Sequence, residues 1–151
     1  MIVLEPNRSA IVDTNVLVYA HQSSDEKKHA IANELIDQLT MSSRLIVTTQ
    51  IINEFAVTCL SSKKKEPLSA PVVQELVHMI TVFSRVLVVN PETTILALGA
   101  VDKHRMSFWD ALIWSTAKLN SIDIIYTEDT QSSENIEGVK YINPFEIISG
   151  I

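Results

Sequence analysis

Four acidic residues stand at positions from which carboxylates commonly do chemistry. Asp13 directly follows the apolar segment 9–12, and Asp129 comes three residues after the apolar segment 124–126. Glu54 and Asp110 lie near the starts of two segments with helical periodicity. Carboxylates that cluster bind hard divalent cations such as Mg2+ or Mn2+, which polarise phosphates and acidify water. The four acids are therefore candidate ligands of a catalytic metal ion.

The elements that would position these acids alternate between short strands and longer helices. Segments 9–12, 45–47, 86–89, 122–126 and 139–142 are apolar and predict strands. Apolar spacing predicts helices after Asp13, over 28–39, from a cap at Thr48 or Thr49 to 60, and over 72–83, 92–104 and 107–119. Apolar strands separated by helices indicate a parallel sheet covered on both faces, so the predicted fold class is α/β.

The predicted topology brings the acids to one place. Ligands of open α/β sheets bind at the carboxyl ends of the strands, where Asp13 and Asp129 stand. The helices that follow strands start at this same edge, with Glu54 in the second turn of one helix and Asp110 in the first turn of another. All four side chains are thus expected to converge on one crevice.

Each acid also has an ordinary structural interpretation. Asp13 is a suitable helix N-cap, and Asp110 stands three residues after Ser107, as in a capping box. Glu54 borders an apolar stripe and suits a solvated helix edge, while Asp129 lies in a sequence typical of a turn. Composition and pattern alone leave these interpretations open beside the metal site.

Composition excludes several other classes of protein. The chain has 151 residues, of which 46% are hydrophobic, enough for a single domain over 1–151. Its three glycines lie too far apart for a Walker loop or a GxGxxG dinucleotide motif. The spacing of its four histidines and of Cys59 does not suit zinc. One cysteine, no leader-like N-terminus and no membrane-length apolar run predict a cytoplasmic protein without a disulfide.

The net charge of −6 is unusual for a protein that handles nucleic acid. Two bound divalent cations would reduce it to −2 and would make the site attract phosphate instead of repelling it. The acidic charge therefore argues against nonspecific tracking along nucleic acid, but it does not exclude metal-assisted hydrolysis.

Four motifs and the C-terminal segment of this sequence resemble the PIN-domain nucleases, in particular the VapC-like toxins of toxin-antitoxin pairs. The motifs occur in the family's order and are spread over nearly the whole length of the chain. They are residues 11–20, 50–55, 107–113 and 126–129, followed by 136–145. The resemblance implies a three-layer α/β/α sandwich with a central parallel sheet, and a Mg2+- or Mn2+-dependent endoribonuclease.

The resemblance also assigns roles to individual residues. It implies that Asp13 and Asp110 bind the metal directly, and that Glu54 and Asp129 bind a second ion or hold metal-bound water. Asp129 is preferred to its neighbour Glu128 on the motif alignment alone. The substrate would be RNA, and the expected partners are a second copy of the chain and an antitoxin that inserts a basic side chain into the acidic pocket.

Three polar residues near the acids are expected to support them. Thr14, Asn15 and Ser107 can hydrogen-bond to the carboxylates and so orient them. For Thr14 and Ser107, local helix capping is an equally good interpretation.

Two further features have open interpretations. Trp109 and Trp114 flank Asp110 and are expected to pack in the core or an interface, with Trp109 shaping the site as the alternative. The lysines at 63–65 are expected in a solvated loop between helices, with contact to RNA phosphates as the alternative.

Two rival functions remain to be compared with the nuclease. A haloacid-dehalogenase-like phosphatase also places an aspartate after the first strand, but it needs a second aspartate two residues later as its general acid. Position 15 is Asn, which cannot donate that proton. A PIN-like binding module without catalysis is the other rival, and the presence of all four acids argues against it.

Overall fold

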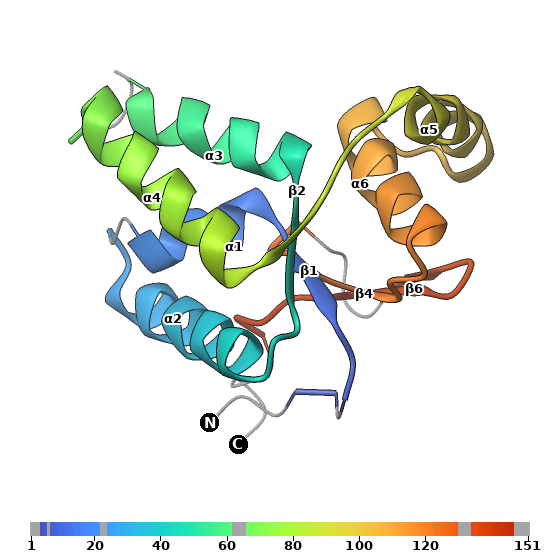
Figure 1. Ribbon diagram of the computed structural model, residues 1–151. Coiled ribbons are helices and arrows are strands. Elements are labelled where there is room, and N and C mark those ends of the chain that lie inside the picture. The colour runs from blue at the N-terminus through green and yellow to red at the C-terminus, as the bar shows by residue number, and fades with distance from the viewer. Residues whose placement is uncertain (1–3, 6, 22–23, 62–65, 130–133, 147–151) are drawn as a thin grey trace.

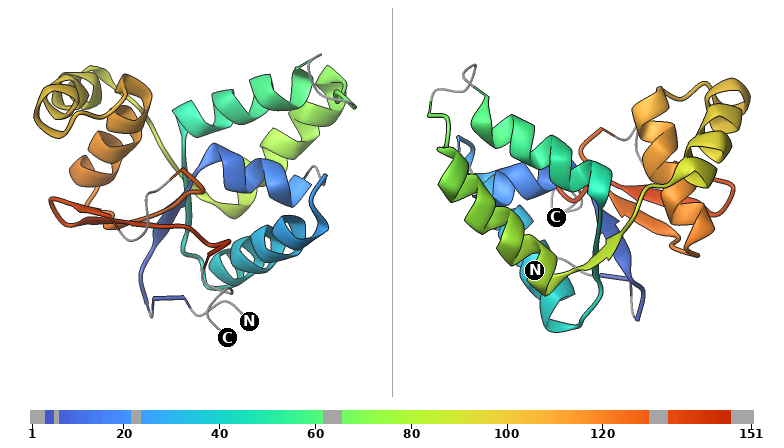
Figure 2. Two further views of the ribbon diagram at one scale, coloured as in Figure 1. Left: turned by 180° about the vertical axis from the view of Figure 1, so that it is seen from behind. Right: turned by 45° about the horizontal axis from the view of Figure 1, so that its top comes forward.

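The computed structural model describes residues 4–5, 7–21, 24–61, 66–129 and 134–146, in which helices flank a central sheet (Figure 1). The elements follow one another along the chain as β1 (Ala10–Val12), α1 (Thr14–His21), α2 (Glu26–Met41), β2 (Leu45–Thr48), α3 (Thr49–Leu60), α4 (Ala70–Phe83), β3 (Arg85–Leu87), α5 (Pro91–His104), α6 (Phe108–Leu119), β4 (Ile124–Tyr126), β5 (Asn135–Ile136) and β6 (Val139–Ile142). Helices α1 to α4 lie on one side of the sheet and α5 and α6 on the other (Figure 2). The predicted three-layer α/β/α architecture is confirmed.

The sheet has the strand order β3-β2-β1-β4-β6-β5, and every pairing except β5–β6 is parallel. In its centre, Ile11 is in register with Ile46 on one side and with Ile125 on the other. All three side chains are at most 1% exposed. This rigid centre fixes the carboxyl ends of β1, β2 and β4 relative to one another.

The prediction for the strand at 86–89 is wrong in its bounds and in its burial. The strand β3 spans Arg85–Leu87, Arg85 is exposed, and Val88 beyond its end is 66% exposed. Because β3 is the edge strand and pairs only with β2, it is not covered as an internal strand would be. The other predicted elements differ from the structure by a few residues at their ends, as is usual for frayed termini.

The sequence did not predict strand β5. It forms an antiparallel hairpin with β6, in which Ile136 pairs with Val139 and leaves Glu137 and Gly138 as the turn. Both turn residues have positive φ, 50° and 90°, as a two-residue hairpin turn of type I′ requires. A strand of two residues is too short to show alternation in the sequence.

The helices pack on the sheet through large apolar side chains, among which Phe55 of α3 is fully buried. Phe55→Ala should therefore lower the free energy of unfolding by about 3–5 kcal/mol, since it removes a buried ring and leaves a cavity. Urea denaturation would measure this loss. The control Ile95→Ala, at a side chain that is 72% exposed, should change stability by less than about 0.5 kcal/mol. Equal effects of the two changes would contradict the described core.

None of the helices within the described ranges has both the length and the apolar character to cross a membrane. Cys59 is fully buried in the apolar core. Residues 62–65, which include the three lysines, lie outside the described residues, so the prediction for that loop remains a prediction.

Candidate active site

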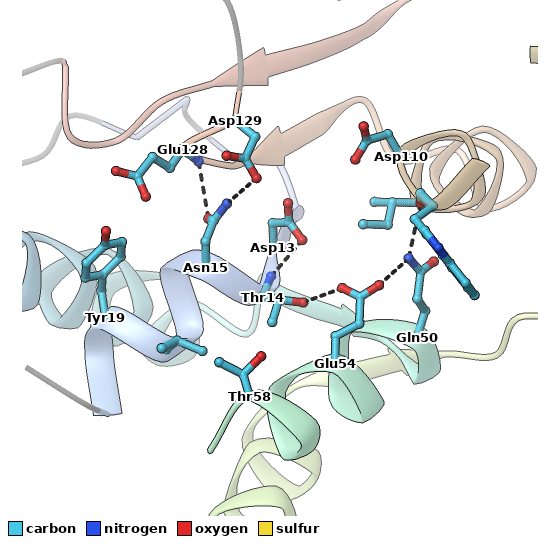
Figure 3. A pocket seen from close by; sticks show the side chains of 13 residues that line it. Asp13, Thr14, Asn15, Tyr19, Gln50, Glu54, Thr58, Asp110, Glu128 and Asp129 are labelled. Atoms are coloured by element: carbon cyan, nitrogen blue, oxygen red, sulfur yellow. Dashed lines mark hydrogen bonds between the residues drawn. The ribbon is translucent and has the colours of Figure 1, made fainter. Parts of the chain in front are cut away.

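The acids predicted to converge do line one cavity, of about 350 Å3, at the carboxyl edge of the sheet (Figure 3). Asp13 stands between β1 and α1, and its backbone N–H donates to the carbonyl of Tyr126 at the end of β4, at 2.9 Å. This bond ties together the strand ends that precede Asp13 and Asp129. Glu54 from α3 and Asp110 from α6 complete the acidic lining.

Asp13 is held by two hydrogen bonds, and its pKa is shifted by burial. Its Oδ1 accepts from the backbone N–H of Thr14 at 2.7 Å, and its Oδ2 accepts from the Thr127 hydroxyl at 2.9 Å. Burial raises the pKa of Asp13 to about 6, against the lowering effect of these two hydrogen bonds. The negative charges of Glu54 and Asp129 raise this pKa further. A cation beside Asp13 would stabilise the charged carboxylate against burial and against the repulsion from Glu54 and Asp129.

Glu54 is held from two sides and is not the solvated edge residue of the alternative interpretation. Its Oε2 accepts from the Thr14 hydroxyl at 2.8 Å, and its Oε1 accepts from the amide Nε2 of Gln50 at 2.8 Å. The same Nε2 donates to the backbone carbonyl of Trp109 at 3.1 Å. Gln50, which is 8% exposed, therefore links Glu54 to the start of α6.

Asp110 takes part in the N-cap of α6 and also lines the cavity. Ser107 caps α6 by accepting from the backbone N–H of Asp110 at 3.1 Å, as the capping interpretation predicted. In return the Ser107 hydroxyl donates to Asp110 Oδ2 at 2.7 Å. The cap thus orients the carboxylate, and Asp110 lines the acidic cavity as well.

Asn15 holds Asp129 in place. Its amide Nδ2 donates to Asp129 Oδ2 at 3.0 Å, and its Oδ1 accepts from the backbone N–H of Glu128 at 3.2 Å (Figure 3). The predicted hydrogen bonds to carboxylates are therefore present for each of the three supporting residues, Thr14, Asn15 and Ser107.

Glu128 points away from Asp129, toward the side of the cavity where Tyr19 lies (Figure 3). Its carboxylate pairs with the ammonium group of Lys28 in α2, which also donates to the Tyr19 hydroxyl at 3.1 Å. This pairing raises the pKa of Lys28 above its usual range. A carboxylate already paired with a lysine is a weaker candidate for a metal ligand than Asp129, which has no cationic partner among the described residues, in agreement with the motif alignment.

The sequence-based prediction missed two residues of the site. Thr127 donates to Asp13 and also accepts from the backbone N–H of Asp129 at 3.2 Å. Gln50 supports Glu54 from one helical turn away. The four-residue spacing of Gln50 and Glu54 on one helix face is a signal that the sequence does contain. Thr127 carries no such signal, because only the pairing of β1 with β4 brings it to Asp13.

The donor set fits a hard divalent cation, although the acids surround the cavity and do not meet at a point. Among the described residues, no three histidine, cysteine or acidic side chains lie close enough to hold one ion. Glu54 and Asp129 are hydrogen-bonded to Thr14 and Asn15 of α1, whereas Asp110 is hydrogen-bonded to Ser107 at the start of α6. Mg2+ needs only one or two protein carboxylates, because it keeps water and takes up substrate phosphate oxygens.

A second cavity, of about 340 Å3, adjoins the acids Asp13, Asp110 and Asp129. Arg105 and Tyr141 are also among the residues that line it. Burial raises the pKa of the Tyr141 hydroxyl, so it stays protonated at neutral pH. The acids are bordered by a cavity whose lining also includes a basic residue, Arg105.

Solved structures with the same fold include toxins of toxin-antitoxin pairs. A toxin-antitoxin complex from Klebsiella pneumoniae aligns with a TM-score of 0.67 at 15% identity, over 90% of this chain and 98% of that one. VapC20 from Mycobacterium tuberculosis, described as a toxin that cleaves the sarcin-ricin loop, gives 0.62 at 16% identity, over 87% and 99%. A DNA-bound VapBC from Salmonella typhimurium gives 0.63 at 14% identity, over 91% and 98%. At these identities the likeness concerns the fold.

The sequence comparisons agree with the fold. No curated protein matches the sequence significantly. The PIN domain family model matches residues 10–136, a range that contains all four acids and nearly the whole sheet. With the fold and the acidic cavity described above, this match shows that the chain belongs to the PIN-domain family.

Proposed function

We propose that this protein is a divalent-metal-dependent endoribonuclease, formed by a single domain over residues 1–151, and that it is the toxin of a VapBC-type pair. The observation that carries the proposal is that Asp13, Glu54, Asp110 and Asp129 line one cavity in a chain of the PIN-domain family. The structures of similar fold, which are described as a toxin and as toxin-antitoxin complexes, support the toxin assignment.

Mg2+ or Mn2+ would be held by Asp13 and Asp110, with Glu54 and Asp129 binding a second ion or positioning water. When bound, such an ion supplies Lewis-acid polarisation of the phosphate and lowers the pKa of a bound water. The chain's own contribution is orientation: Thr14, Thr127 and Gln50 fix the carboxylates Asp13 and Glu54 from their outer sides. Such outer hydrogen bonds keep ligating oxygens aimed at the site.

The partners follow from the same proposal. The substrate is RNA, which approaches an acidic cavity once its charge is offset by cations. The structures of similar fold that are described as toxin-antitoxin or VapBC complexes support an antitoxin as the second partner. A basic antitoxin side chain in the acidic cavity would compete with the metal. A homodimer and a cytoplasmic location remain predictions.

The direct test is to incubate the purified protein with structured and single-stranded RNAs in Mg2+, in Mn2+ and in EDTA. Cleavage in either metal that stops in EDTA is the expected result. If no RNA is cut and calorimetry detects no binding of Mg2+ or Mn2+, the nuclease proposal is wrong, and a binding module on a PIN fold would remain.

Thr127→Val should weaken Mg2+ binding roughly 10- to 100-fold, as the loss of an outer hydrogen bond to a metal ligand commonly does. The change removes the hydroxyl that donates to Asp13 and nearly conserves the side-chain shape. Calorimetric titration with Mg2+ measures the effect. Thr116→Val is the matched control, because it removes a buried hydroxyl that bonds within α6 to the carbonyl of Leu112. Equal affinities in both variants would exclude the supporting role of Thr127.

A further inference from the structure

Trp109 is exposed beside the acids, although it was expected to pack in the core or an interface. Its side chain is 61% exposed, whereas Trp114 in the same helix is 3% exposed and donates its indole N–H to the carbonyl of Ile136 at 3.1 Å. The ring of Phe108 packs edge-on against Trp109, with the centroids 5.3 Å apart. Trp109 is therefore a supported aromatic surface that immediately precedes Asp110.

Trp109 forms part of the boundary between the acidic cavity and a third cavity of about 770 Å3. We call this third cavity the α3–α6 groove; five residues line both it and the acidic cavity: Thr14, Gln50, Glu54, Thr58 and Trp109. Val57, Val89 and Leu112 add apolar surface to the groove. The groove is thus continuous with the acidic cavity, and its size lies in the range of ordinary ligand pockets, roughly 300–1,000 Å3.

The charges of the lining decide which part of an RNA fits the groove. Among the described residues that line it, Glu54 is the one with a charge, and Glu54 already accepts hydrogen bonds from Thr14 and Gln50. A phosphate would find no cation among these described lining residues, whereas Arg105 is among the residues that line the cavity beside the other acids. A neutral group therefore fits the groove better than a phosphate does, and the ring of Trp109 offers a planar group a surface for stacking.

We propose that the α3–α6 groove receives an unpaired nucleobase next to the scissile phosphate, and that the base stacks on Trp109. This inference rests on the proposed nuclease function, since a phosphate at the acids leaves the neighbouring base beside Trp109. Proteins recognise single-stranded RNA chiefly by stacking its splayed bases on aromatic side chains.

Gln50 provides an independent polar observation at the same place. It lines both cavities and is 8% exposed, and its amide oxygen has no hydrogen-bond donor among the described residues. A buried acceptor without a donor destabilises a structure, and a nucleobase N–H is a donor of the kind that this oxygen lacks once the Gln50 side chain turns it toward the groove. The exposed amide of Asn53 in the same lining adds a further polar group.

Intrinsic fluorescence tests the stacking directly, because the chain has two tryptophans and Trp114 is buried. The probe is hexa-adenylate RNA, added to the protein in Mg2+ and followed by stopped-flow fluorescence before it is cut, beside an abasic oligoribonucleotide of equal length. We expect saturable quenching by hexa-adenylate and little by the abasic oligomer. The quenching should persist in Trp114→Phe and vanish in Trp109→Phe.

Kinetics provides the second readout. Trp109→Ala should raise KM for single-stranded RNA about 5- to 100-fold, the range expected for the loss of one stacked base. Its kcat should change by less than about fivefold, because stacking of this kind acts on substrate binding. Trp109→Phe should retain most of the affinity, and Ile95→Ala, at an exposed residue outside all three cavities, should change neither constant.

The outcomes separate this inference from the nuclease proposal. If RNA is cut but Trp109→Ala leaves KM unchanged and hexa-adenylate does not quench, the stacking inference is wrong and the nuclease stands. If no RNA is cut but quenching depends on the base and on Trp109, stacking stands and the nuclease is wrong. If Trp109 emission instead changes with protein concentration and not with RNA, the groove binds a second copy of the chain and the inference is overturned.

Discussion

Asp13→Asn and Asp110→Asn are each expected to lower the rate of RNA cleavage by at least about 10³-fold. Each change replaces a carboxylate proposed to ligate the metal by a neutral amide of the same shape. The ion contributes several kcal/mol to stabilising charge in the transition state, and about 4 kcal/mol corresponds to three orders of magnitude in rate. Single-turnover cleavage at saturating Mg2+ measures the effect on chemistry.

The adjacent residues Glu128 and Asp129 provide the control for this experiment. Both residues line the cavity, but Asp129→Asn removes a carboxylate that is held by Asn15, whereas Glu128→Gln removes one that pairs with Lys28. We expect Asp129→Asn to lose much of the activity and Glu128→Gln to keep it within about tenfold, as for a partly exposed ion pair. A larger loss in Glu128→Gln than in Asp129→Asn would mean that the motif alignment assigns the fourth acid wrongly.

The placement of the acids could be predicted because it follows from two simple features of the sequence. Apolar segments mark the strands, and in a parallel sheet whatever follows a strand emerges at the same edge. These two features are enough to place Asp13 and Asp129 at the carboxyl edge of the sheet. Glu54 and Asp110 needed only the starts of two helices, and Ser107 and Thr48 cap those helices as predicted.

The supporting contacts could not be predicted, because they depend on register and not on residue type. Thr127 reaches Asp13 only because Val12 is paired with Tyr126. Trp109 could equally have been a core residue, since α6 is buried on all sides over the seven consecutive residues that begin directly after Asp110. Its exposure depends on which elements cover the start of α6, and neighbouring sequence does not contain that information.

Asp13→Asn should also stabilise the protein in the absence of divalent metal, by about 2–3 kcal/mol at pH 7 to 8. The pKa of Asp13 is about 6 in the folded chain, against an ordinary value of 3.8, so folding favours the protonated acid. Protonation of Asp13 therefore adds to the free energy of unfolding below pH 4, and this stabilisation is lost as the pH rises through about 6. A neutral amide at this position avoids the loss, which for such a pKa difference amounts to about 3 kcal/mol.

Urea denaturation in EDTA from pH 4 to pH 8 would measure this difference. The two proteins should be equally stable near pH 4 and should diverge through pH 6, with a Tm difference of roughly 5–10 °C at pH 7.5. Saturating Mg2+ should then reverse the order, because it stabilises the native state of the wild type in proportion to its affinity and binds the variant weakly. If Asp13→Asn is no more stable than the wild type in EDTA at pH 7.5, Asp13 does not carry a buried charge among other acids. The electrostatic basis of the proposed metal site would then be lost, even if the protein proved to be a nuclease.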